Sequence, residues 1–269
     1  MKKQTWLAAS ALTLVAALVG VAPADAGTAP RDPNLDGGFV LGPVLDAQQG
    51  TAVNWIDHFD TYVLDSQIHG QGGWTGWGDT AANGAFVRDT FSRTAPHSIE
   101  IAPTSDLVQE YDGYTSGTWT LTAQQYIPAA FSGQHYFLLL NTYVGATPTA
   151  CPTCNWSTQV VFDSSSGTLG PDFGPCSGSA SFITDQWVPI RVVIDLDTNN
   201  YDFFYNESLV YSCSWTEGAS GGGALNIDAL DLFANGSSNV YYDDISLSNL
   251  DFLDGFESGD TREWHYTEP

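Results

Sequence analysis

The segment 187–206, WVPIRVVIDLDTNNYDFFYN, determines the fold class. Apolar residues occupy every second position from Ile190 to Leu196, which is the period of a β-strand with one buried face. Turn-forming residues follow at 197–200, and aromatic residues alternate from Tyr201 to Tyr205. The segment therefore predicts a β-hairpin.

The same period of two recurs in the segments 118–128 (TWTLTAQQYIP) and 157–163 (STQVVFD), and the last predicted strand is 240–247 (VYYDDISL). The segment 135–143 (HYFLLLNTY) is apolar on both faces at its centre, which is typical of a central strand. No extended apolar repeat of period 3.6 occurs outside the N-terminal segment. Such strands, separated by turn residues, predict an all-β fold, namely a two-sheet antiparallel β-sandwich.

The first 26 residues have the pattern of a signal peptide. Lys2 and Lys3 precede an apolar run, and Ala24 and Ala26 place small residues at the −3 and −1 positions of a cleavage site. The run is shorter than the roughly 20 residues that span a bilayer, which disfavours a membrane anchor. We therefore expect a secreted protein of bacterial type that does not insert into a membrane.

The remaining chain divides into three parts. Residues 27–50 are rich in Gly, Pro, Asp and Ala and predict a linker or a loosely attached N-terminal arm. Residues 51–249 hold the strand signals and predict one β-sandwich domain. Residues 250–269 predict a C-terminal tail, which either pairs against the sandwich or serves as a signal for export machinery.

The charge of the chain limits its partners. Its 7 lysines and arginines stand against 31 aspartates and glutamates, for a formal net charge of −24. Such a surface repels phosphate backbones and anionic lipids, so nucleic acid is excluded as a partner. A polyanionic substrate is disfavoured as well unless metal ions intervene, whereas acidic clusters attract calcium.

The four cysteines predict two disulfides, because an even number in an exported chain normally pairs. Three connectivities are possible for Cys151, Cys154, Cys176 and Cys213, and the sequence does not rank them. A zinc site at Cys151 and Cys154 is the alternative, but no second close pair of ligands follows.

Three segments together resemble a known family. The stretch HFDTYVLDSQIHGQGGWTGW (58–77), the hairpin 187–206 and the segment 240–247 are similar to bacterial members of the concanavalin A-like lectin and glucanase superfamily, the laminin-G-like jelly rolls. The resemblance extends over roughly residues 55–249. It implies a jelly roll that binds or cleaves carbohydrate, because that superfamily contains lectins, hydrolases and lyases.

The catalytic motifs of that superfamily are not found in this chain. Glucanases of that superfamily carry the motif E-x-D-x-E on one strand, but no two glutamates of this chain are four residues apart. Gln67-Ile68-His69 resembles one alginate-lyase motif, yet the R-x-E-x-R strand that accompanies it does not occur. Glu100 and Glu110 lie on separate strand-like segments that could approach each other.

We therefore expect a secreted, lectin-like protein that binds a glycan, neutral rather than anionic, without catalysis. The alternatives are a glycoside hydrolase or polysaccharide lyase of the same fold, and a structural or adhesive surface protein.

Carbohydrate binding needs aromatic faces that stack on sugar rings and polar groups that meet sugar hydroxyls. Trp74 and Trp77 lie in a glycine-rich run, and because they are three residues apart we expect one ring to be buried and the other to reach a groove. The full set of predicted carbohydrate contacts is Trp74, Trp77, Gln125, Tyr126, Asn141 and Tyr143.

The resemblance also implies a structural calcium ion. In similar sandwiches the first and last strands lie side by side, and an acidic residue from each joins the ligands of the ion. In this sequence those residues are Asp60 and either Asp243 or Asp244, and hard oxygen ligands suit calcium. The alternative is that Asp243 and Asp244 merely face water, although two adjacent aspartates between apolar residues require a counter-charge.

Overall fold

A computed structural model describes residues 53–249 of the chain. The predicted signal peptide (1–26), N-terminal arm (27–50) and C-terminal tail (250–269) lie outside the described residues.

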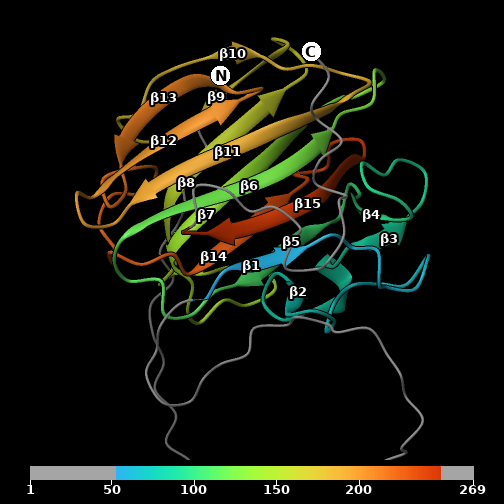
Figure 1. The fold of residues 1–269 in the computed structure, drawn as a ribbon, viewed down its shortest axis with the longest axis horizontal. Coiled ribbons are helices and arrows are strands. Elements are labelled where there is room, and N and C mark those ends of the chain that lie inside the picture. The colour runs from blue at the N-terminus through green and yellow to red at the C-terminus, as the bar shows by residue number, and fades with distance from the viewer. Residues whose placement is uncertain (1–52, 250–269) are drawn as a thin grey trace, which may run out of the picture. The chain divides into compact units, whose positions relative to one another are not determined.

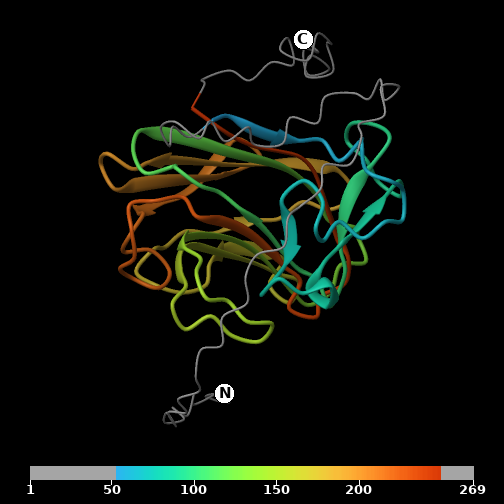
Figure 2. The same cartoon turned by 90° about the horizontal axis from the view of Figure 1, so that it is seen from below.

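Two antiparallel sheets lie face to face (Figures 1 and 2), as predicted for a β-sandwich jelly roll. Sheet A has the order β13-β12-β11-β6-β15-β4-β3, and β1 also pairs with β15. Its strands are β1 (Trp55–Asp57), β3 (Phe86–Arg88), β4 (Ser98–Ile101), β6 (Thr118–Tyr126), β11 (Trp187–Asp195), β12 (Asn200–Tyr205), β13 (Ser208–Ser214) and β15 (Val240–Ser248).

Sheet B has the order β10-β9-β8-β7-β14-β5-β2. Its strands are β2 (Trp74–Gly76), β5 (Asp106–Glu110), β7 (Gln134–Thr142), β8 (Asn155–Asp163), β9 (Thr168–Pro171), β10 (Ala180–Ser181) and β14 (Ala229–Phe233). In the described range the only helical element is a single 3₁₀ turn, η1 (Ala81–Asn83).

The predicted hairpin is formed by β11 and β12, with Ile194 opposite Tyr201. Its turn is stabilised by Asp195, whose Oδ1 accepts the backbone N–H groups of Asp197 and Thr198 at 3.0 and 3.1 Å. The predicted central strand, β7, lies between β8 and β14. The first and last described strands, β1 and β15, pair side by side with Trp55 opposite Leu247, which confirms that prediction too.

Trp74 fixes the glycine-rich run to the core between the sheets. Its side chain has 0% exposure and packs against Trp55 and Phe59 at ring-centroid distances of 5.8 and 5.6 Å. Its indole N–H donates to Asp57 Oδ2 at 2.9 Å, so the polar edge of the buried ring is satisfied.

The glycines in the run allow the chain to pass close to other backbone on both sides of Trp77. A Cβ atom on Gly76 would lie 2.1 Å from the carbonyl oxygen of Thr80. Gly78 has φ +64°, and a Cβ there would lie 2.2 Å from the carbonyl carbon of Thr147. The run is therefore a tightly packed segment that directs Trp77 to the opposite side from Trp74.

Replacing Trp74 by alanine should lower the free energy of unfolding by about 3–5 kcal/mol, since it removes a large buried ring. Urea denaturation followed by fluorescence measures the change. Leu209→Ala is the matched control. Because Leu209 is 56% exposed, its replacement should lower the free energy of unfolding by less than about 0.5 kcal/mol. A similar small loss for Trp74→Ala would contradict the anchoring role.

Candidate functional site

A cavity of about 280 Å³ lies on the face of sheet B that points away from sheet A. It is formed by the neighbouring strands β8, β7, β14 and β5 and by the segments that follow β2 and β14. We call this cavity the groove. Its lining consists of Trp77, Asp106, Tyr136, Leu138, Trp156, Gln159, Asp231, Phe233 and Asn235.

Alternation along β14 places Asp231 in the groove. Leu230 and Leu232 on either side of it belong to the core between the sheets, so the side chain of Asp231 points to the opposite face. In the β14–β5 pair, Asp231 lies opposite Val108 and Phe233 lies opposite Asp106. Asp106 and Asp231 are thus diagonal neighbours on the same face.

A side-chain hydrogen bond links the two carboxyls and contributes to the pKa shift of each. Burial raises the pKa of Asp106 to about 6, although the hydrogen bond from Asp231 opposes this shift. Burial, the charge of Asp106 and the same hydrogen bond raise the pKa of Asp231 well above its ordinary value. Apart from the contact between the two carboxyls, no N–H or hydroxyl group of residues 53–249 donates to the buried Oδ1 atom of either aspartate.

Aromatic rings form the walls of the groove. Trp77 and Trp156 are stacked at a centroid distance of 6.1 Å and an interplanar angle of 14°. Tyr136 and Phe233 form a second stacked pair, at 5.9 Å and 30°. The groove therefore combines apolar ring surface with a polar floor, the usual composition of a small-ligand site.

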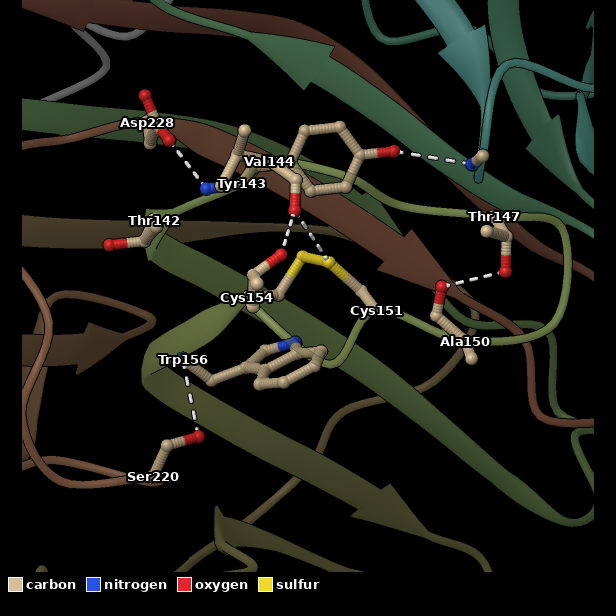
Figure 3. The surroundings of a disulfide bond; sticks show 12 residues. Thr142, Tyr143, Val144, Thr147, Ala150, Cys151, Cys154, Trp156, Ser220 and Asp228 are labelled. Atoms are coloured by element: carbon tan, nitrogen blue, oxygen red, sulfur yellow. Dashed lines mark hydrogen bonds between the residues drawn. A yellow bond between two sulfur atoms is a disulfide. The ribbon is translucent and has the colours of Figure 1, made fainter. Parts of the chain in front are cut away.

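The loop after β7 supports the tryptophan wall (Figure 3). The Tyr143 hydroxyl accepts the backbone N–H of Gly78 at 3.2 Å, and its ring meets Trp77 edge-on at 5.1 Å. The Cys151–Cys154 disulfide closes this loop and packs with Trp156 against the small apolar cluster that contains Trp77.

The predicted disulfides are confirmed, and their pairing is Cys151–Cys154 and Cys176–Cys213. A zinc site at Cys151 and Cys154 is therefore wrong, because the two sulfur atoms are bonded to each other. In the described range no helix is long and apolar enough to cross a membrane.

Three of the predicted carbohydrate contacts are wrong because their side chains are buried away from the groove. Trp74 lies in the core between the sheets, as described above. The side-chain amide of Gln125 donates to the Tyr242 hydroxyl at 2.7 Å in the interior. The side-chain amide of Asn141 donates to Ser157 Oγ at 2.9 Å and is equally buried.

The other three predicted contacts have different positions. Trp77 lines the groove, but its side chain is only 7% exposed, so it is largely buried rather than freely available at the groove. Tyr143 supports Trp77 from behind. Tyr126 lies on sheet A, where it stacks on Phe91 at 4.1 Å, and it is not part of the groove lining.

The carboxyl pair and three of the four aromatic rings of the groove, Tyr136, Trp156 and Phe233, are not among the residues predicted from the sequence. One signal for them exists, because Asp231 interrupts the apolar segment ALDLF (229–233) at a position between two leucines. Glu100 and Glu110, the two glutamates that could approach each other, lie on β4 and β5 in different sheets. Glu100 instead forms an ion pair with Arg88 at 2.8 Å.

The aspartates expected to bind calcium accept hydrogen bonds from N–H groups of the protein. Asp244 accepts a hydrogen bond from the Arg93 guanidinium at 2.7 Å and lies 2.7 Å from His58 Nδ1. Asp243 accepts the backbone N–H groups of Arg93 and Thr94. Asp60 accepts the backbone N–H of His97 at 3.3 Å.

This donor set does not fit a calcium ion, because a guanidinium already supplies positive charge to Asp244. In residues 53–249 no cluster of three or more His, Cys, Asp or Glu side chains could hold a metal. Burial and the charge of Asp244 raise the pKa of Asp243 to about 8. Burial opposes ionisation of Asp244, but hydrogen bonds from His58 and Arg93 lower its pKa. Calcium binding stays a prediction that these contacts do not support.

No protein-family model matches the sequence, and no curated protein matches it. Among solved structures, the chain is similar to the catalytic domain of a glycoside hydrolase family 131 protein from Coprinopsis cinerea. The two share 12% identity, and the match covers 76% of this chain and 97% of that domain, with a TM-score of 0.49. A sialidase matches with 11% identity and a TM-score of 0.48 over 77% of this chain, which spans only 20% of the sialidase. The Caenorhabditis elegans galectin LEC-6 matches with 11% identity over 53% of this chain and 89% of its own, with a TM-score of 0.35. The fold assignment rests on the strand pairing of the chain itself.

The carboxyl pair should make stability depend on pH. Because the folded-state pKa values of both carboxyls are raised, the pair contributes stability that is fully present below about pH 4 and is lost as pH rises through about 6. Asp231→Asn should therefore be more stable than the unchanged protein at pH 8, by on the order of 2 kcal/mol, with little difference at pH 4. Guanidinium denaturation at the two pH values measures this, with the exposed Asp89→Asn as control. If the difference in unfolding free energy between Asp231→Asn and the unchanged protein does not vary with pH, the raised pKa values of the pair are contradicted.

Arg93, rather than a metal ion, should stabilise Asp243 and Asp244. Arg93→Met should lower the free energy of unfolding by about 3–5 kcal/mol, because it leaves buried carboxylates without their cation. The control is Arg191→Met. The ion pair of Arg191 with Glu207 is more exposed, so its loss should lower the free energy of unfolding by less than about 1 kcal/mol. Scanning calorimetry with and without EDTA should give the same Tm for the unchanged protein. A Tm that falls with EDTA would restore the calcium hypothesis.

Proposed function

We propose that the groove on sheet B binds a glycan, and that the protein acts as a lectin-like carbohydrate-binding sandwich. The observation behind this proposal is that stacked aromatic rings surround a floor of carboxyl and amide groups in one cavity. Aromatic faces stack on the apolar side of sugar rings, while Asp106, Gln159 and Asn235 offer polar atoms to sugar hydroxyls. The volume of about 280 Å³ is close to the lower end of the roughly 300–1,000 Å³ range of small-ligand sites.

The acidic character of the chain argues for a glycan that is not anionic. Its net charge is −24, and the groove lining holds two carboxyls. A uronate or sulfate group would meet like charge at the floor. We place this function outside the cell, because two disulfides suit an oxidising compartment and the N-terminus has the pattern of a signal peptide.

Hydrolysis of a glycan in the same groove is the second candidate function. Burial raises the pKa values of Asp106 and Asp231, and carboxyls with raised pKa values are typical of acid–base catalysts. Glycosidases, however, hold their two carboxyls about 5–5.5 Å apart or about 6.5–9.5 Å apart, with the sugar or a water between them. Asp106 and Asp231 are instead hydrogen-bonded to each other, so we rank binding first.

Trp156→Ala should weaken glycan binding roughly thirtyfold, about 2 kcal/mol, because it removes a central aromatic contact. Affinity electrophoresis on a panel of neutral polysaccharides identifies a ligand. Titration calorimetry then measures the affinity of the unchanged protein and of Trp156→Ala for that ligand. The matched control is Tyr126→Ala, which removes a half-buried ring from sheet A instead of sheet B.

Two outcomes would contradict the proposal. One is that no glycan in the panel is retained, and the other is that Tyr126→Ala weakens binding while Trp156→Ala does not. The same incubations are assayed for released sugar. Release that is lost in Asp106→Asn would favour the hydrolase.

A further inference from the structure

We propose that the groove selects glycans that carry a positively charged amino group, such as N-deacetylated amino sugars. This inference rests on the proposed glycan binding and names the chemical class of the ligand.

The first argument is that the carboxyl pair has no cation of its own. In the described part of the chain, the groove lining contains Asp106 and Asp231 but no arginine, lysine or histidine. The arginines of residues 53–249 pair with acids on sheet A or in loops beside it, as Arg88 with Glu100, Arg93 with Asp244 and Arg191 with Glu207. None of these pairs involves a residue of the groove lining.

Second, the floor of the groove holds carboxyl oxygens that no basic, amide or hydroxyl side chain of the described residues satisfies. Asp231 is only 2% exposed, and apart from its contact with Asp106 no N–H or hydroxyl group of residues 53–249 donates to its buried Oδ1. Oδ1 of Asp106 is in the same situation. An ammonium group carries three N–H donors and a positive charge, so it satisfies both oxygens and neutralises the pair.

The third argument concerns the groups around the pair, which add negative charge. Glu110 lies on the same face of β5, Asp228 precedes β14, and Asp172 follows β9, where it accepts the Tyr136 hydroxyl at 3.0 Å. Burial and nearby acids, Asp228 and Asp79, raise the pKa of Glu110. Burial likewise raises the pKa of Asp228.

The tyrosine hydroxyls at the groove and behind its tryptophan wall add no positive charge. Burial, with nearby acids, raises the pKa of Tyr136, which lines the groove, and raises that of Tyr143, which lies behind Trp77, to about 12. Among residues 53–249, the charged groups named around Asp106 and Asp231 are thus acids, and they favour a cationic ligand.

The aromatic walls also favour a cation that is attached to a sugar. The faces of Trp77, Trp156 and Tyr136 carry partial negative charge and attract ammonium groups within about 6 Å. The same rings stack on the apolar face of a pyranose, so the sugar ring lies against the wall while its amino group reaches the floor.

Binding of an ammonium group displaces a proton from the carboxyl pair. Burial raises the pKa of Asp106 to about 6 and that of Asp231 well above its ordinary value, so the free pair favours a bound proton. A cation at the floor favours ionisation of both carboxyls, so binding releases that proton. A neutral sugar has no charge that would cause this release.

The test compares two probes of equal length, the β-1,4-linked trisaccharide of N-acetylglucosamine and its fully N-deacetylated counterpart. Titration calorimetry at about pH 6 in two buffers of different ionisation enthalpy gives both affinity and proton release. We expect the deacetylated trisaccharide to bind roughly tenfold more tightly or better, as one charge-assisted hydrogen bond warrants. It should release about one proton, and the acetylated trisaccharide none.

Asp106→Asn should abolish the preference for the deacetylated trisaccharide, and Asp89→Asn, on an exposed loop beside sheet A, should keep it. Thermal unfolding establishes that both variants are folded. If Asp106→Asn keeps the preference, the overall charge of the protein causes it and the inference fails.

The remaining outcomes separate this inference from the proposed function. If both trisaccharides bind equally and Trp156→Ala weakens both, the inference fails and glycan binding in the groove stands. If neither trisaccharide nor any glycan of the neutral panel binds, the proposed function fails, and the inference fails with it.

Discussion

The alternation of side chains along β14 is the constraint on which the groove depends. Leu230 and Leu232 are fully buried between the sheets, and each contributes about 1.5–3 kcal/mol through its burial. A shift of one residue would expose both leucines and place Asp231 in the apolar core. The burial of the leucines therefore fixes the register and holds Asp231 on the groove face, where its partner Asp106 lies on the next strand.

The same alternation made most of the fold predictable from the sequence. The period of two identified β6, β8, β11 and β12, and the apolar centre of 135–143 identified β7 as a central strand. It also predicted that Trp74 and Trp77 point in opposite directions. Alternation alone could have excluded Gln125 as a ligand contact, because Gln125 shares its face with Trp119, Leu121 and Ala123. Asn141 shares its face with Phe137 and Leu139 in the same way.

The groove could not be predicted because it depends on contacts that are distant in the sequence. Asp106 and Asp231 meet only because β5 and β14 pair across more than a hundred residues. Trp77 follows β2 and Trp156 lies on β8, and these distant segments meet, together with the Cys151–Cys154 disulfide, in one small apolar cluster. The ion pair at Asp243 and Asp244 was equally hard to predict. The sequence indicated that these aspartates need a counter-charge, but it did not identify Arg93 as the source of that charge.

The chain thus contains two buried carboxyl pairs with opposite surroundings. At Asp243 and Asp244, an arginine, a histidine and backbone N–H groups satisfy the oxygens, as expected of a pair that stabilises the fold. In residues 53–249, the side chains of Asp106 and Asp231 are hydrogen-bonded to each other and to no arginine, although the same chain places arginines beside other acids. Uncompensated burial of this kind costs stability, and proteins retain such arrangements mainly at functional sites. The contrast between the two pairs is the reason to assign the groove, rather than the aspartates on β15, to a ligand.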